Sequence, residues 1–345
     1  MRTLMKLMAA SAAMLLASCS VHEWPELPEN VQFHLRLNYE SEMTTQEYSY
    51  NEGVITDEGE SLTYDNQLER GENRYIIRAY PLTEKQRATN YIKEFVITKD
   101  IAEGYDHGVN LELPAGSYNI MVWSDLTPVA GGPYYHNADD FAEISLMPEH
   151  SGNTDYRDAF RGMGEVVLVS DIIDDAPDTL DITMQRPLAK YEIVSTDLQE
   201  FIDKELDYLA SVNGPNKAPS QINTQDYTVV LLYTGYMPDT YNMYADKPID
   251  SYMGVTIQTK LKELNSSEAS LGFDYVLMGT TPSSIQVQIG LFDKDQRQVA
   301  LSNSINVPLN RSKHTVVRGS FLMTQSSGGI EIDPEFNGDH NIVID

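Results

Sequence analysis

Cysteine is almost absent from this sequence: among its 345 residues only Cys19 carries a thiol. A single thiol excludes an intramolecular disulfide framework, so the fold must be stabilised by burial of apolar side chains. A chain of this length can form one large domain or two ordinary ones.

Basic residues are also scarce. The chain has 24 Lys and Arg residues against 52 Asp and Glu residues, which gives a formal net charge of −28. Such a charge repels phosphate backbones and anionic lipid headgroups. We therefore exclude nucleic acid as a partner, and we exclude a basic membrane-binding face as well.

Sequence motifs of the common enzyme classes are missing. There is no G-x-S-x-G, no H-E-x-x-H, no P-loop and no G-x-G-x-x-G. The seven histidines are scattered, and none lies within four residues of another. We expect no catalytic function, no cofactor and no metal, although catalytic carboxylate pairs are defined by distance in space and cannot be read from a sequence.

One acidic run and one tyrosine cluster leave alternatives open. Asp171, Asp174, Asp175 and Asp178 have a spacing that could hold Ca²⁺, but in so acidic a chain a solvated loop is the preferred interpretation. The tyrosines could line a glycan-binding face, and a loop packed by its own side chains is preferred. The residues of this cluster are Tyr233, Tyr236, Tyr241 and Tyr244, with Pro238 among them.

The N-terminus has the features of a secretory signal. Arg2 and Lys6 precede an apolar run over residues 7–17, which is too short to span a bilayer. The run ends in Leu16-Ala17-Ser18-Cys19, which resembles the lipobox of bacterial lipoproteins. This resemblance predicts a signal peptide over residues 1–18, lipidation of Cys19 with fatty acids such as palmitate, and an anchor of two or three acyl chains, which is durable where one is not.

Downstream of the cysteine, the sequence predicts a spacer followed by a strand. Residues 19–30 are rich in Pro and Glu, a composition that predicts an extended spacer. The next residues alternate between apolar and polar, as in a strand that buries one face. The apolar positions of this strand are Val31, Phe33, Leu35, Leu37 and Tyr39.

Short strand patterns then recur along the whole chain, in two series of about seven. They predict an all-β protein of two tandem β-sandwich domains, over residues 31–185 and 186–345. Leu113-Pro114-Ala115-Gly116 is typical of a hairpin turn, and a second turn is expected at residues 293–296. The segment 40–69 fits no element of the pattern.

One helix is expected. Thr196-Asp197-Leu198-Gln199 has the form of a capping box, apolar residues follow at helical spacing to Leu209, and Gly214-Pro215 ends the pattern. We expect a crossover helix that packs against the second sandwich.

The C-terminus ends in a predicted hairpin. Asn337-Gly338 is a strong turn signal between apolar residues that alternate with polar ones. A terminal strand can most easily leave one sheet and pair with another, so these apolar residues are candidate interface positions. They are Ile330, Ile332, Ile342 and Ile344.

Several short sequence motifs resemble those of the fimbrillin-like lipoproteins of Bacteroidales, specifically the family of fimbrial anchor subunits. They occur in the order of that family and span most of the chain after Cys19. They are residues 113–118 (LPAGSY) leading into 122–125 (VWSD), 156–160 (YRDAF), 186–191 (RPLAKY), 273–276 (FDYV), and 307–311 (VPLNR) continuing through 315–319 (TVVRG) to Phe321-Leu322.

This resemblance implies two transthyretin-like β-sandwiches, a lipid anchor in the outer membrane with exposure at the cell surface, and assembly with other fimbrial subunits by donation of a strand. In that family, stalk subunits lose their first strand to an arginine-directed protease, whereas anchors keep strand and lipid. No Arg or Lys occurs from Leu37 to Glu69, which favours an anchor or accessory subunit. The alternative is a surface glycan-binding lipoprotein of a nutrient-uptake system.

Overall fold

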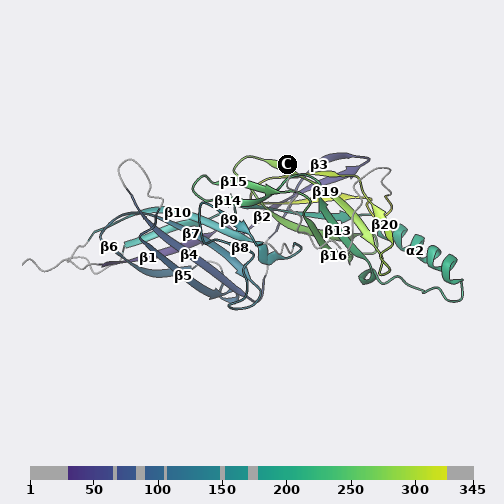
Figure 1. Cartoon of the computed structure of the whole chain (residues 1–345), viewed down its shortest axis with the longest axis horizontal. Coiled ribbons are helices and arrows are strands. Elements are labelled where there is room, and N and C mark those ends of the chain that lie inside the picture. The colour runs from purple at the N-terminus through teal and green to yellow at the C-terminus, as the bar shows by residue number, and fades with distance from the viewer. Residues whose placement is uncertain are drawn as a thin grey trace, which may run out of the picture.

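The computed structural model describes residues 30–64, 68–82, 90–104, 107–147, 152–169 and 178–324. Strands dominate this part of the chain, and the molecule is elongated, with one lobe built mostly from the first half of the chain and one mostly from the second (Figure 1). The predicted all-β sandwich class is confirmed.

The first lobe is a sandwich of two sheets. Its inner faces enclose a core that contains Phe33, Leu35, Ile77, Val122 and Phe160. One sheet has the order β11-β1-β6, and the other has the order β10-β7-β4-β5. The strands are β1 (Asn30–Tyr39), β4 (Glu72–Pro81), β5 (Lys93–Asp100), β6 (His107–Pro114), β7 (Gly116–Thr127), β10 (Ala159–Leu168) and β11 (Asp178–Met184).

The second lobe pairs a six-stranded sheet with a five-stranded one. The orders are β17-β18-β12-β22-β2-β3 and β16-β13-β19-β20, with β21 also paired to β19. The strands of the first are β2 (Met43–Asn51), β3 (Val54–Tyr64), β12 (Leu188–Ser195), β17 (Lys262–Glu263), β18 (Ala269–Leu277) and β22 (Lys313–Gly319). Those of the second are β13 (Thr228–Tyr233), β16 (Thr256–Lys260), β19 (Ser283–Phe292), β20 (Gln298–Leu301) and β21 (Ile305–Leu309).

A fifth sheet lies between the lobes (Figure 1) and is built from both halves of the chain. Its strands, in order, are β15 (Lys247–Tyr252), β14 (Met237–Asn242), β9 (Ile144–Leu146) and β8 (His136–Asn137). Trp123 of β7 packs here against Tyr241, with 6.4 Å between ring centroids. The small sheet therefore covers the second face of the β7 sheet, which explains why β7 is buried on both faces.

The hairpin β2–β3 is a second connection between the lobes, in addition to the shared small sheet. Although residues 43–64 precede most of the first lobe in sequence, β2 pairs in parallel with β22 in the second lobe. Neither strand was predicted, because β2 is mostly polar in sequence and β3 is exposed along nearly all its length without apolar alternation. The predicted division at residues 185 and 186 stays a prediction, and this pairing crosses it.

The predicted hairpin at Leu113-Pro114-Ala115-Gly116 is wrong. The strand β6 before this turn pairs with β1, whereas β7 after it pairs with β4 and β10. Both strands face the same core from opposite sheets, so the turn carries the chain across the sandwich. The Tyr118 hydroxyl closes the turn by donating to the Pro114 carbonyl at 2.9 Å. The second predicted turn is confirmed, since β19 and β20 pair across residues 293–297.

The predicted helix is confirmed as α2 (Leu198–Asn213), with Leu198 and Phe201 buried in the second core. Its N-cap is Asp197 rather than Thr196, and its carboxylate makes no capping bond. Short 3-10 helices lie at η1 (Ile101–Glu103), η2 (Asp155–Arg157) and η3 (Thr224–Asp226).

Asp197 instead holds the last described segment of the chain. Its carboxylate accepts from the Leu322 amide at 3.3 Å and from the Met323 amide at 3.0 Å. Asp197→Ala should therefore lower the free energy of unfolding by about 1–3 kcal/mol, because buried amides lose their acceptors. Urea unfolding would measure this, with Asp203→Ala on the exposed face of α2 as the control within about 0.5 kcal/mol. Equal midpoints for the two variants would contradict the expected effect.

Candidate functional site

The first strand predicted from the sequence fills the centre of its sheet. β1 pairs in parallel with β11 on one side and antiparallel with β6 on the other. Phe33, Leu35 and Leu37 have no exposed surface, while Val31 and Tyr39 are partly buried at the two ends. The strand thus occupies the groove of its own sandwich; a role in strand exchange stays a prediction.

The other candidate residues lie outside the described part of the chain. These are Cys19, the interface candidates Ile330, Ile332, Ile342 and Ile344, and the acidic run at Asp171, Asp174 and Asp175. Their predicted roles stay predictions.

The structure separates the tyrosine cluster. Tyr233 and Tyr241 are fully buried, whereas Tyr236 is 68% exposed and Tyr244 is 37% exposed. The Tyr233 hydroxyl donates to the Asp274 carboxylate at 2.7 Å, inside the second lobe. The four side chains therefore do not form one glycan-binding face.

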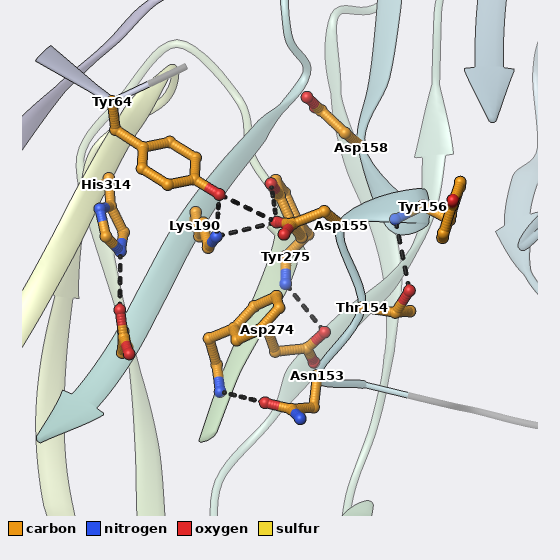
Figure 2. Close-up of polar contacts among 12 residues, drawn as sticks. Tyr64, Asn153, Thr154, Asp155, Tyr156, Asp158, Lys190, Asp274, Tyr275 and His314 are labelled. Atoms are coloured by element: carbon orange, nitrogen blue, oxygen red, sulfur yellow. Dashed lines mark hydrogen bonds and ion pairs between the residues drawn. The ribbon is translucent and has the colours of Figure 1, made fainter. Parts of the chain in front are cut away.

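A buried polar cluster at the junction of the lobes was not predicted; Figure 2 shows the part of it around Asp155. It brings together three of the sequence motifs described above, which lie far apart in the chain, at residues 156–160, 186–191 and 273–276. Arg186 and Asp158 form its core as an ion pair at 2.9 Å, with neither side chain exposed. The two residues come from the linker before β12 and from the loop before β10, so the pair joins the halves of the chain.

A second ion pair lies beside the first. Arg157, at the end of η2, pairs with Asp274 on β18, and both side chains are almost completely buried. The second oxygen of Asp274 accepts from the Tyr233 hydroxyl, which in turn accepts from the Tyr191 hydroxyl at 2.9 Å. A chain of buried hydrogen bonds therefore runs from η2 into the core of the second lobe.

The third pair is Lys190 of β12 with Asp155 of η2, at 2.8 Å from Nζ to Oδ1. The same carboxylate oxygen accepts from the Tyr275 hydroxyl at 2.8 Å and from the Tyr64 hydroxyl at 3.2 Å. Figure 2 shows Tyr64, Lys190 and Tyr275 converging on this oxygen. Tyr64 lies at the end of β3, so the cluster also fixes the β2–β3 hairpin.

A further clamp is centred on Asp246, in the turn between β14 and β15. Its carboxylate accepts from Arg161 of the first lobe at 3.2 Å and from Arg311 of the second lobe at 2.6 Å. The pairs around η2 and this clamp together bind the two lobes at several points.

Burial dominates the electrostatics of the cluster. It raises the pKa of the Asp158 carboxyl, and the Arg186 guanidinium limits the rise. It also lowers the pKa of the Lys190 amine, because desolvation outweighs the attraction of Asp155. Within the described residues, no group of three or more His, Cys, Asp or Glu side chains could hold a metal ion. The arrangement is suited to holding distant segments of the chain together.

The sequence motifs that form this cluster were recognised, but the contacts between them were not predicted. Arg157-Asp158, Arg186 and Asp274 each stand beside apolar residues of a strand or turn, which is an available signal for a buried charge that needs a partner. Pairing them needed the tertiary structure, because the partners are separated by tens to more than a hundred residues.

The family assignment comes from a profile match over residues 25–345 to a family of unknown function, DUF6562. The chain belongs to this family. No match was found among curated proteins.

Several solved structures resemble the fold of this DUF6562 member. The fimbrial anchor protein Mfa2 from Porphyromonas gingivalis has 12% identity and a TM-score of 0.36, covering 79% of this chain and 82% of that one. The tip fimbrial protein Mfa3 from the same species, crystallised with a C-terminal truncation, has 9% identity and a TM-score of 0.35, with 81% of each chain covered. A candidate adhesin from Bacteroides ovatus has 10% identity and a TM-score of 0.38, covering 79% of this chain and 76% of that one.

The described residues contain no helix long and apolar enough to cross a membrane.

Proposed function

We propose that this chain is a subunit of a cell-surface fibre, tethered to the outer membrane by lipid on Cys19 and acting as the anchor or an accessory subunit. The proposal starts from the sequence motifs that resemble those of fimbrial anchor subunits. One structural observation supports it: β1 is the central strand of its sheet, with both of its edges paired. A subunit that keeps this strand has no vacant groove in that sheet to accept a strand from a neighbour.

The chain after β1 supports the same role. β1 ends at Tyr39, and no Arg or Lys follows until Arg70. Residues 43–64 are paired in β2 and β3, so the link between the lobes starts almost directly after β1. An arginine-directed protease has no site in this link. Contact with other fimbrial subunits would then use other surfaces, and the hairpin predicted from the sequence at Ile330, Ile332, Ile342 and Ile344 is our candidate.

The tether is tested by Cys19→Ala. We expect the variant to lose incorporation of an alkyne fatty acid and to move from the membrane fraction to the soluble fraction, since no thiol remains to carry lipid. Ser20→Ala is the matched control and should keep both label and membrane association.

The same cells also test the proposed role in a fibre, through the fraction in which partner proteins are found. Partner proteins that form ladders with the wild-type chain on unboiled gels should leave the membrane fraction together with Cys19→Ala. Equal labelling of wild type and Cys19→Ala would contradict the lipid anchor, and a wild-type chain without any co-migrating partner would contradict the fibre role.

A further inference from the structure

The environment of Lys190 differs from that of an ordinary ion pair. Its side chain is 3% exposed, and Nζ lies 4.1 Å from the ring centroid of Tyr64, 4.1 Å from that of Phe273 and 5.4 Å from that of Tyr275. Asp155 is the carboxylate partner, at 2.8 Å. An amine and a carboxyl group are thus held together within an aromatic enclosure that excludes most water from the amine.

We propose that Lys190 and Asp155 condense to form an intramolecular isopeptide bond between β12 and η2. The Nζ–Cγ bond forms and one Cγ–O bond breaks, with release of one water molecule. An ammonium and a carboxylate supply all the atoms: two of the three ammonium protons leave with one carboxylate oxygen, and the third stays on the amide nitrogen. The reaction needs no oxidant, reductant or activated co-substrate.

Two tyrosines are placed to assist the reaction. The hydroxyls of Tyr64 and Tyr275 both donate to Oδ1 of Asp155. When the amine attacks Cγ, negative charge develops on this oxygen, and two hydroxyl donors stabilise it in the manner of an oxyanion hole. Oδ2 is then the oxygen that leaves as water.

The remaining requirements are a neutral amine, close approach and an exit for water. Burial lowers the pKa of the Lys190 amine, so the ammonium gives up a proton more readily here than at an exposed site. Packing of β12 and η2 holds the reacting groups together, which replaces an encounter between separate molecules. The Asp155 side chain is 27% exposed, so the released water has a path to solvent.

The chain contains its own comparison pair. Lys313 Nζ also lies 2.8 Å from a carboxylate oxygen, that of Glu60, but the two side chains are 30% and 55% exposed. Solvent hydrates both of these exposed groups, so Lys313 and Glu60 should remain an ion pair. Distance alone therefore does not define the proposed site.

Mass spectrometry of the full chain tests the proposal. After correction for the substituted residue, the wild-type chain should be lighter than the Lys190→Met variant by the mass of one water. Trypsin should not cleave after Lys190 in the wild-type chain, because its amine is acylated, and Lys190 should be found in one cross-linked peptide with Asp155. Cleavage after Lys313 should be normal.

Asp155 variants separate the chemistry from folding. Asp155→Ala should restore the missing water and the cleavage after Lys190. Asp155→Asn should form the same amide with loss of ammonia, and so should yield the same cross-linked peptide. The proposal is overturned if the wild-type chain has the full mass of its sequence, or if the missing water maps to any other pair of residues.

Discussion

Leu35→Asp is expected to unfold the first lobe. Leu35 lies in the middle of β1 with no exposed surface, and it contributes roughly 1.5–3 kcal/mol by burial. The variant loses this term and places a carboxylate without a partner in the core, which costs several kcal/mol more. Together these costs are comparable with the whole stability of an ordinary domain, which is roughly 5–15 kcal/mol.

Calorimetric melting and limited proteolysis would show this loss. Asn30→Asp adds the same charge at an exposed position of the same strand, and its melting temperature should match that of the wild type. If Leu35→Asp melts within a few degrees of Asn30→Asp, β1 is dispensable to the lobe. The proposal that a retained β1 fills its own groove then loses its structural basis.

Asp158→Ala should lower the free energy of unfolding by about 3–5 kcal/mol, because it leaves the Arg186 guanidinium buried without its carboxylate. The double variant Asp158→Leu with Arg186→Met should recover most of this loss, since apolar side chains can replace a buried ion pair at little cost. Denaturant unfolding of Asp158→Leu, of Arg186→Met and of the double variant gives the coupling energy directly.

The control for this experiment is the exposed pair Arg36 and Asp181, at 3.3 Å, whose side chains are 54% and 53% exposed. Arg36→Met should cost no more than about 1 kcal/mol. A similar small cost for Asp158→Ala would mean that the buried pair does not hold the lobes together.

Local patterns predicted well where an apolar face alternates with a clearly polar one. The apolar alternation of β1 and the helical spacing of α2 each gave the right element, with bounds within a few residues. The pattern failed for β3, which is exposed along almost all its length and owes its place to pairing with β2. It also failed for the turn at residues 113–116, because turn residues reverse a chain without specifying whether the next strand joins the same sheet.

The buried cluster shows the same limit at the level of function. Its motifs were recognisable as family features, at residues 156–160, 186–191 and 273–276. Nothing in their spacing indicated that Arg186 contacts Asp158 or that Lys190 contacts Asp155. These contacts depend on which sheets pack at the junction of the lobes, and that packing is not encoded in any one stretch of sequence.

The amino-acid sequence by itself determined the all-β class of the protein, through a strongly acidic chain with a single thiol and through apolar alternation that can only be buried in sheets. These are properties of composition and short-range periodicity, which act before any distant contact forms. Only the tertiary structure decided that β2 and β3 belong to the second lobe and that one small sheet is shared by both lobes. It also brought an amine and a carboxylate into one aromatic enclosure. Such features arise from contacts between segments far apart in the chain, where the burial of one surface depends on all the others.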